Sequence, residues 1–372
     1  MTTTHPTRSI DANELVARLA ADEPVTILDI RDDAAWTIEA PNVTVRHVPA
    51  HCAAATLDDL ARDLPDDTVI LCNRGVTAQQ LADRLLAKGR MLPVLLGGLR
   101  GWIATLRPVP VDLGVEDLRV LQIQRPGRGC LSYLVASGDQ ALVVDPAPDA
   151  QFYADLASEL SVEIRDVVDT HLHADHLSGA RELAAITGAA LRLPAGSLER
   201  GVSYADSVTP LKDGDEIALG DLTVRAVHLP GHTTDMTGLV VADRALIGGD
   251  SLFADGLARP DLEQGDPDGS RAMARRLHAT LHERILALGD DVVLLPGHHH
   301  PGVPAGAVAP TLAEVRARVD SLAIADPDAF AEDVVADMPP RPANYEAIIA
   351  VNSGTHPFDP ELESGGNSCS AR

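Results

Sequence analysis

The stretch Thr170-His171-Leu172-His173-Ala174-Asp175-His176 is the most informative part of this chain for both fold and chemistry. It places three histidines and an aspartate within six residues, shortly after the apolar pair Val167-Val168. Imidazole and carboxylate groups are ligands for zinc, iron and manganese. A lone histidine is usually a core or surface residue, but this density at the end of a strand-like run predicts a metal site.

Three more potential ligands each follow an apolar run through a short link that contains glycine. They are His232 after Thr223–Leu229, Asp250 after Ala245–Ile247, and His298 after Val292–Leu295. A rigid sheet holds ligands at the ends of its strands, and glycine lets the backbone approach an ion. The sequence therefore predicts that these residues and the histidine cluster form one metal centre.

The composition narrows the classes of function. The chain has 372 residues, 45% of them hydrophobic, which is enough for two domains with full cores. It carries 55 acidic and 30 basic residues, a net charge of −25, which argues against nucleic acid and anionic membranes as partners. The segment Met1–Ile10 has no apolar core like that of a signal peptide, and the four cysteines form no C-x-x-C pair. We therefore expect a cytoplasmic protein without disulfides.

The chain divides near residue 110. Before that point, strand-like and helix-like runs alternate, which predicts an α/β domain with a parallel sheet. These runs are Val25–Ile30, Val69–Leu71, Ala78–Ala87 and Pro93–Leu96. Pro108-Val109-Pro110 is typical of a linker, and the region from Ser353 has the Gly, Ser, Glu and Pro content of a disordered tail. We predict domains at residues 8–108 and 117–352, followed by a disordered tail at 353–372.

A short apolar strand leads into the loop Cys72-Asn73-Arg74-Gly75-Val76-Thr77, and a helix follows. Backbone N–H groups of such a loop, and the N-terminus of the helix behind it, stabilise an anion and favour a thiolate or persulfide at Cys72. Gly89 is a candidate for the stop of that helix. Cys52 and Cys130 have no such loop and are interpreted as ordinary core cysteines, and Cys369 as incidental.

The first domain resembles a single-domain rhodanese over about residues 8–108. The resemblance rests on Leu28–Arg31, Cys72–Thr77 and Leu96–Trp102. It implies an α/β fold in which Cys72 accepts sulfane sulfur from a donor such as thiosulfate. The family's usual arginine late in the loop is Thr77 here, and an arginine stands earlier, so Arg74 is the candidate donor-binding residue.

The second domain resembles the metallo-β-lactamase superfamily over roughly residues 117–352. The resemblance rests on the order, spacing and strand context of His171–His176, Pro230–Thr233, Gly249-Asp250 and Pro296–His298. It implies an αββα sandwich with the metal at one edge of its sheets.

Two enzyme types of that superfamily fit these residues. Glyoxalase II enzymes hydrolyse thioesters with two zinc ions. One ion would be held by His171, His173 and His232 and the other by Asp175, His176 and His298, with Asp250 bridging them. A metal hydroxide would attack the thioester carbonyl.

Persulfide dioxygenases have the same residues but use one Fe(II). His171, His232 and Asp250 would bind the iron and leave positions for a persulfide sulfur and O₂. The remaining four residues, His173, Asp175, His176 and His298, would then support these ligands or be left as a second metal site.

Three stretches favour the dioxygenase. Gly256–Leu262 is similar to the dioxygenase sequence that follows the aspartate, Pro296–Gly302 lacks the Gly-His-Glu-Tyr of glyoxalase II, and Pro339–Tyr345 with Asn352 looks like dioxygenase-type sequences. The fusion itself adds weight, because a rhodanese makes or consumes persulfides. Arg259 either binds the carboxylate or sulfur end of a thiol carrier or pairs with Asp261.

We therefore expect a sulfur-metabolism enzyme with two active sites. Its iron domain would convert a low-molecular-weight thiol persulfide and O₂ to thiol and sulfite, and its rhodanese domain would move sulfane sulfur through Cys72. A two-zinc thioester hydrolase is the alternative, and a non-catalytic sulfur carrier is a third class. No nucleic-acid or membrane partner is expected, and a homo-oligomer is compatible with the sequence.

Overall fold

The computed structural model describes residues 8–33, 36–263, 266–299, 302–336, 338–341 and 343–363. The chain forms two compact units. The N-terminal unit comprises Met1–Arg107, Arg125–Gly129 and His300–Gly306, and the C-terminal unit comprises Pro108–Gln124, Cys130–His299 and Ala307–Arg372. Each unit is described by itself.

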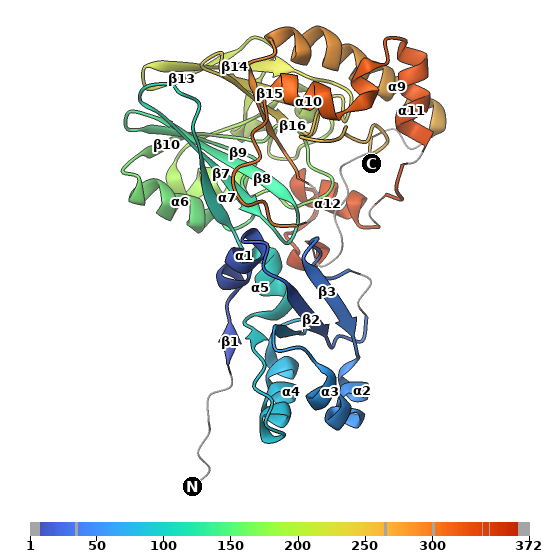
Figure 1. The fold of residues 1–372 in the computed structure, drawn as a ribbon. Coiled ribbons are helices and arrows are strands. Elements are labelled where there is room, and N and C mark those ends of the chain that lie inside the picture. Colours follow the sequence, from blue (N-terminus) through green and yellow to red (C-terminus); the bar gives the residue numbers. More distant parts are fainter. Residues whose placement is uncertain are drawn as a thin grey trace. The chain divides into compact units, whose positions relative to one another are not determined.

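The N-terminal unit is built on a five-stranded sheet of order β1-β5-β4-β2-β3 (Figure 1). Its strands are β1 (Ser9–Ile10), β2 (Val25–Asp29), β3 (Val43–His47), β4 (Thr68–Leu71) and β5 (Val94–Leu95). Its helices are α1 (Ala12–Ala20), α2 (Ala50–Ala55), α3 (Leu57–Asp63), α4 (Val76–Ala87) and α5 (Gly98–Ala104). Every neighbouring pair of strands in this sheet runs parallel, as the alternation of strand-like and helix-like runs predicts.

The parallel sheet buries both of its faces. Ile27 of β2 packs with α1 and α5 on one face, whereas its neighbour Leu28 packs with α3 and α4 on the other. Successive side chains of a strand point to opposite faces, so strands covered on both sides are apolar throughout. The predicted helix Ala78–Ala87 is confirmed but begins at Val76, after Gly75 in the left-handed conformation (φ +84°). Gly89 follows its end with φ +81°, as predicted for a helix stop.

The C-terminal unit contains two sheets, a seven-stranded one of order β12-β11-β10-β9-β8-β7-β6 and a five-stranded one of order β13-β14-β15-β16-β17. The strands of the seven-stranded sheet are β6 (Arg107–Val111), β7 (Leu118–Arg125), β8 (Cys130–Ser137), β9 (Gln140–Val144), β10 (Glu163–Val168), β11 (Ala190–Pro194) and β12 (Thr209–Leu211). The strands of the five-stranded sheet are β13 (Glu216–Leu219), β14 (Leu222–His228), β15 (Thr237–Val241), β16 (Ala245–Gly249) and β17 (Val293–Pro296). The helices are α6 (Ala150–Glu159), α7 (Ala180–Thr187), α8 (Ala195–Glu199), α9 (Pro267–Ala279), α10 (Leu312–Arg318), α11 (Pro327–Ala336) and α12 (Tyr345–Asn352), with a π-helix over Thr280–Ile285.

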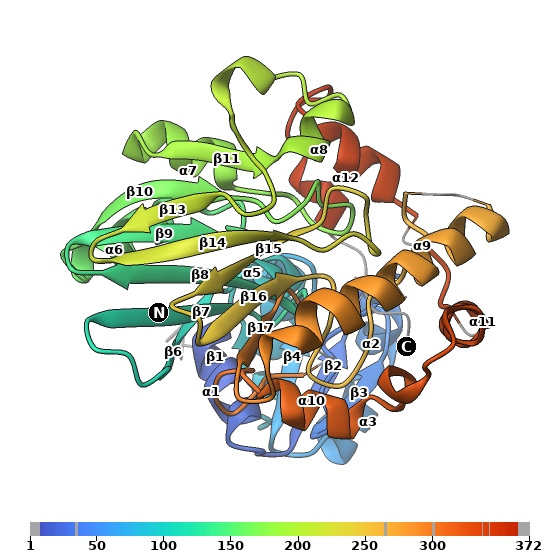
Figure 2. The ribbon, with the colours of Figure 1, turned by 90° about the horizontal axis from the view of Figure 1, so that it is seen from above.

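These elements form a four-layer αββα sandwich, as predicted (Figure 2). The two sheets share one apolar core, in which Val144 and Val168 of the first sheet pack with Leu239 and Ile247 of the second. Helices α6 and α7 cover the outer face of the seven-stranded sheet. Helix α9 packs through residues such as Leu277 on the outer face of the five-stranded sheet.

Two segments differ from the prediction. Pro108-Val109-Pro110 is not a linker but part of β6, at the edge of the seven-stranded sheet. Proline is tolerated on an edge strand, where its missing N–H need not join the hydrogen-bond ladder. The expected disordered tail is also wrong for residues 353–363, because a buried Glu363 accepts a hydrogen bond from the backbone N–H of Leu177 (2.9 Å). Residues 364–372, with Cys369, lie outside the described residues.

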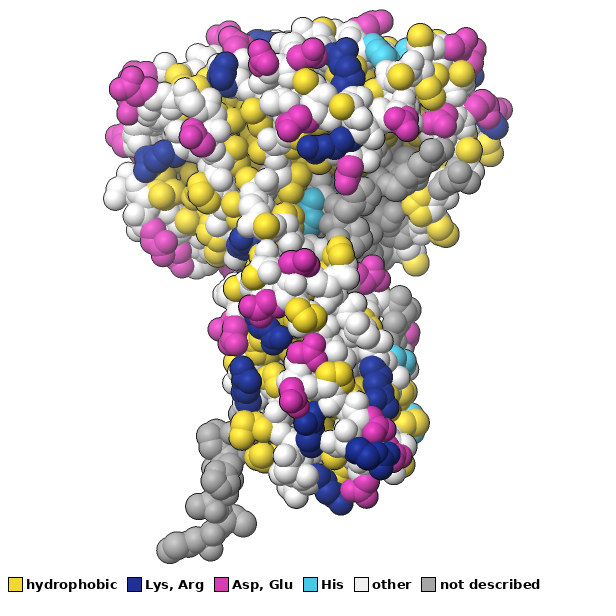
Figure 3. All heavy atoms as spheres, viewed as in Figure 1, with side chains coloured by type: hydrophobic (Ala, Val, Ile, Leu, Met, Phe, Trp, Pro, Cys, Tyr) yellow, Lys and Arg dark blue, Asp and Glu magenta, His cyan; other side chains and the backbone are white. Residues whose placement is uncertain are grey.

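Among the described residues, none of the helices has the length and apolar character needed to span a membrane. The face of the protein in Figure 3 shows acidic and basic side chains interspersed on both units.

Replacing Gly98 by alanine should destabilise the N-terminal unit. A Cβ there would lie 2.2 Å from the carbonyl oxygen of Cys72, at a φ of +58° that alanine resists. We expect a loss of roughly 3 kcal/mol from backbone strain and overpacking. Both tryptophans, Trp36 and Trp102, belong to this unit, so urea unfolding followed by their fluorescence reports on it.

Gly89→Ala is the matched control for this substitution. Gly89 also has a positive φ, but nothing lies within 4 Å of a Cβ built there. It should lose only about 1 kcal/mol. Equal losses in the two variants would show that the close approach of Gly98 to the Cys72 loop is unimportant.

Candidate metal centre

The predicted ligands follow the ends of four strands of the C-terminal unit. The histidine cluster follows β10, His232 follows β14, Asp250 follows β16 and His298 follows β17. Strands β16 and β17 run parallel, so they deliver Asp250 and His298 to the same end of their sheet. Gly297 makes this possible, since a Cβ on it would lie 2.4 Å from Oδ1 of Asp250.

His171, His232 and Asp250 form one compact group. Their ligand atoms lie within 4.8 Å of one another. Oδ2 of Asp250 is 3.9 Å from Nε2 of His171 and 3.7 Å from Nε2 of His232, and all three side chains are buried. None of these three atoms has a hydrogen-bond partner among the described residues.

Buried polar atoms without partners are costly and uncommon in proteins. Three of them that face one another fit a bound cation, which would satisfy all three at once. Two imidazoles and one carboxylate, with further positions open, form the ligand set of non-haem iron oxygenases. The residues present therefore fit a single divalent metal ion.

Hydrogen bonds on the opposite ring nitrogens orient the two histidines. Nδ1 of His171 lies 3.0 Å from the hydroxyl of Thr170, which itself donates to Asp145 (2.9 Å). Nδ1 of His232 lies 2.8 Å from the backbone carbonyl oxygen of Arg259. Partners of this kind fix ring orientation and tautomer, so each Nε2 is left to face the metal.

The electrostatics favour deprotonated ligands. Burial and the neighbouring charge of His173 lower the pKa of His171 to about 3, which leaves its imidazole neutral. Burial opposes ionisation of Asp250, but His298 and His232 hold the pKa of that carboxyl below its usual range. Neutral imidazole and ionised carboxylate are the forms that bind a metal.

A second group lies directly behind Asp250. It contains Cys130, Asp175, His176 and His298, whose ligand atoms also lie within 4.8 Å of one another. His298 contacts Oδ1 of Asp250 through Nδ1 (2.7 Å) and Asp175 through Nε2 (2.9 Å). This group therefore holds the Asp250 oxygen that does not face His171 and His232.

The interpretation of Cys130 as an ordinary core cysteine misses its surroundings. Cys130 is buried, but it pairs with His298 in an isolated antiparallel bridge. Burial raises the pKa of its thiol, yet His176 and His298 outweigh this effect and lower the pKa to about 6. No local signal in the sequence reveals this, because the contact joins strand β8 to the distant loop after β17.

His173 belongs to neither group. Its Nε2 lies 3.0 Å from Asp145 and 3.7 Å from Asp169, with which it forms a third cluster. Asp145 thus contacts both His173 and the hydroxyl that orients His171. The ring of His173 also lies beside that of His171, with centroids 4.2 Å apart, and its Nδ1 is buried without a hydrogen-bond partner among the described residues.

Arg259, a candidate for substrate binding, pairs with Asp261 instead, which is the alternative that the sequence left open. Its side chain is fully buried and donates to both carboxylate oxygens of Asp261 (2.8 and 3.1 Å). The guanidinium also donates to the backbone carbonyl oxygens of Pro339 and Pro340. Burial in this network leaves Arg259 a structural residue whose own carbonyl positions His232.

Asn352 and Asp235 brace the histidine loop from outside. The amide of Asn352 donates to the backbone carbonyl oxygens of His173 (3.0 Å) and His176 (2.8 Å). The carboxylate of Asp235 accepts from the backbone N–H of Leu172 (3.0 Å). The sequence alone does not reveal this role of Asp235, because most aspartates in loops are solvent-exposed and have no such contact.

The N-terminal unit places Cys72 at the end of β4. Its sulfur accepts hydrogen bonds from the backbone N–H groups of Gly75 (3.2 Å) and Ala78 (3.4 Å), and the residue is only 6% exposed. The loop thus presents N–H dipoles to the sulfur, as predicted from its position before a helix. Arg74 is exposed and forms no hydrogen bond or ion pair within the described part of the chain.

Thr170→Val should weaken metal binding in the C-terminal unit. Valine keeps the buried shape but removes the hydroxyl that bridges Asp145 and His171. Loss of such a partner costs roughly 10–100-fold in metal affinity. Competition with a chromophoric chelator measures the affinity. Thr170→Ser keeps the hydroxyl and should bind nearly as well as the wild type, and equal weakening in both variants would contradict a role for this bond.

The chain was compared with known proteins. A family model for the metallo-beta-lactamase superfamily matches residues 125–298. The mitochondrial persulfide dioxygenase ETHE1 of Homo sapiens is 30% identical over 186 residues, which cover 49% of this chain and 68% of that protein. The hydroxyacylglutathione hydrolase GloC of Haemophilus influenzae is 25% identical over 175 residues, which cover 42% of this chain and 79% of that protein. The crystal structure of ETHE1 from Myxococcus xanthus is 26% identical, with a TM-score of 0.55, and the match covers 63% of this chain and 98% of that one.

Proposed function

Because the chain belongs to the metallo-beta-lactamase superfamily, we propose that its C-terminal unit is an iron-dependent persulfide dioxygenase. The observation that carries the proposal is the group of three partnerless atoms on His171, His232 and Asp250. The similarity to the persulfide dioxygenase ETHE1 of Homo sapiens and to the crystal structure of ETHE1 from Myxococcus xanthus supports it. The reaction would convert R–S–SH, O₂ and H₂O into RSH, sulfite and two protons.

Fe(II) held by this group would supply open positions where a persulfide sulfur and O₂ meet. His171 and His232 would act as neutral donors, and Asp250 would supply one negative charge. Thr170 and the carbonyl of Arg259 would keep the imidazoles in place through their other nitrogens. His298 would hold the second oxygen of Asp250 and so keep the carboxylate from rotating.

The position of His173 bears on the number of metal ions. His173 lies beside His171, with ring centroids 4.2 Å apart, and its Nε2 contacts Asp145 and Asp169. Its buried Nδ1 has no hydrogen-bond partner among the described residues, so His173 is placed to serve as a further ligand in a two-zinc thioester hydrolase. The alternative keeps some support, because the similar GloC protein is a hydroxyacylglutathione hydrolase and the group behind Asp250 offers further ligands. The metal content and the reaction measured with each substrate separate the two functions.

Protein purified without added metal should contain about one iron per chain and consume O₂ when given a thiol persulfide. Asp250→Ala should lose most of the iron and this activity, because it leaves two neutral ligands for a divalent ion. Elemental analysis and an oxygen electrode provide the measurements, and circular dichroism verifies folding. Asp221→Ala, which removes an exposed acid in the same unit, should behave as the wild type.

Two zinc ions per chain, with hydrolysis of S-lactoylglutathione and no O₂ uptake, would rule out the dioxygenase. That result would favour the thioester hydrolase instead.

For the N-terminal unit we propose sulfur transfer through Cys72. The thiolate would attack the outer sulfur of thiosulfate, forming a Cys72 persulfide and releasing sulfite. Two backbone N–H groups that donate hydrogen bonds to the Cys72 sulfur support this proposal, because they would also stabilise a persulfide anion. Arg74 is exposed beside this loop and is the candidate for binding the dianionic donor.

Cys72→Ser should abolish sulfur transfer from thiosulfate and leave O₂ uptake with a supplied persulfide intact. A hydroxyl is a poor nucleophile for this exchange, and the proposed iron ligands include no cysteine. Thiocyanate formation from thiosulfate and cyanide measures the transfer. Cys52→Ser, at an exposed cysteine of the same unit, should transfer sulfur normally. Loss of iron or O₂ uptake in Cys72→Ser would refute the two-site proposal.

A further inference from the structure

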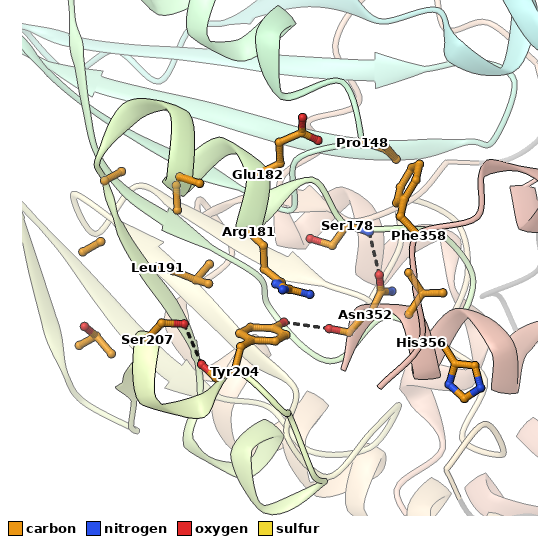
Figure 4. A pocket seen from close by; sticks show the side chains of 16 residues that line it. Pro148, Ser178, Arg181, Glu182, Leu191, Tyr204, Ser207, Asn352, His356 and Phe358 are labelled. Atoms are coloured by element: carbon orange, nitrogen blue, oxygen red, sulfur yellow. Dashed lines mark hydrogen bonds between the residues drawn. The ribbon is translucent and has the colours of Figure 1, made fainter. Parts of the chain in front are cut away.

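A cavity of about 640 Å³ lies in the C-terminal unit beside α7 and α12 (Figure 4). Its wall also includes residues of β11 and of the segment around Tyr204. No member of the group His171, His232 and Asp250 lines it. Ligand pockets for small molecules commonly have volumes of roughly 300–1,000 Å³, so the cavity is large enough for an organic molecule.

Arg181 is the central charged group of this cavity. Its guanidinium lies over the ring of Tyr204, with its carbon 4.2 Å from the ring centroid, and Figure 4 shows the two side chains stacked inside the pocket. Within the described residues, Arg181 forms neither a hydrogen bond nor an ion pair. Stacking of this kind orients the guanidinium without using its N–H donors.

Among the described residues, most arginines of this unit pair with an acid, and Arg181 does not. Arg192, Arg200 and Arg259 all pair with an aspartate. The chain carries a net charge of −25, so acidic partners are abundant. A fixed guanidinium with five free donors matches the two oxygens of a carboxylate.

The rest of the wall is largely neutral. Glu182 is the one acid among the lining residues, and His356 contributes an imidazole. Leu191 and Phe358 contribute apolar surface, and Phe358 is 57% exposed. An inorganic anion would leave this apolar wall uncovered, so the chemistry favours an anion with a hydrophobic body.

We propose that this cavity binds a small organic acid, whose carboxylate pairs with Arg181 and whose apolar part lies along Leu191 and Phe358. The site is separate from the metal chemistry proposed above and does not depend on it.

The bound acid would also reach the metal loop through a short chain of contacts. Tyr204, which carries the stacked Arg181, donates its hydroxyl to the backbone carbonyl oxygen of Asn352 (2.8 Å). The amide of Asn352 donates to the carbonyl oxygens of His173 and His176 and accepts from the N–H of Ser178 (3.0 Å). Fixing Arg181 and Tyr204 should therefore steady Asn352 and the histidine loop that it braces.

Calorimetric titration of the intact chain with benzoate tests the proposal. The wild type should bind benzoate, and Arg181→Gln should bind at least tenfold more weakly. Benzamide, which has the same ring without the charge, should not bind. Arg276→Gln is the matched control, since Arg276 is also exposed and without a hydrogen-bond or ion-pair partner in the described residues, but it lies on α9 outside the cavity.

Benzoate binding that survives in Arg181→Gln, or that benzamide reproduces, would overturn the site. Binding of sulfate at Arg181 without binding of benzoate would overturn the organic class of the ligand. Hydrogen exchange with mass spectrometry reports on the coupling. Benzoate should slow exchange in the peptide that contains His171–His176 in the wild type and in Arg276→Gln but not in Arg181→Gln. Unchanged exchange in the presence of bound benzoate would overturn the coupling to the metal loop.

Discussion

The buried carboxylate of Asp250 is the constraint on which the rest of the metal centre depends. Its side chain is 1% exposed, and an ionised carboxylate at such a position is strongly unfavourable unless both of its oxygens have partners. One oxygen contacts His298, and the other faces two imidazole nitrogens that have no hydrogen-bond partner in the described part of the chain. A bound metal cation would complete this arrangement, provided that the surrounding residues hold these atoms in place.

The two sheets hold Asp250 and the histidine loop in position. Strand β16 is buried along its whole length between β15 and β17, so its C-terminal end can hold a charged residue in a fixed position. The histidine loop comes from the other sheet, after β10. Its position relative to Asp250 is therefore set by the apolar core that both sheets share. Packing of residues such as Val168 and Ile247 thus determines indirectly where the candidate ligands lie.

The sequence predicts that His171, His232 and Asp250 lie together because the signal for each is local: an apolar run and then a polar residue, with a glycine between them for His232 and Asp250. The parallel sheet also follows from local alternation of strand-like and helix-like runs, whereas the sandwich is expected from the resemblance to the metallo-β-lactamase superfamily. The partners of the ligands depend on contacts between distant segments, which no local pattern encodes. Cys130 opposite His298, and the burial of Arg259 against Pro339 and Pro340, are examples. The edge strand over Pro108-Val109-Pro110 was missed because proline marks both linkers and edge strands.

The chain stabilises two buried cysteine sulfurs by different physical means. The sulfur of Cys72 accepts hydrogen bonds from two backbone N–H groups, which the loop holds in place and which do not titrate. Cys130 depends on the charges of His176 and His298, which change with protonation and with any metal that those histidines bind. Only the first arrangement gives the sulfur an environment that does not change with protonation or metal binding. This difference supports Cys72 as the sulfur carrier and places Cys130 in the network that holds Asp250.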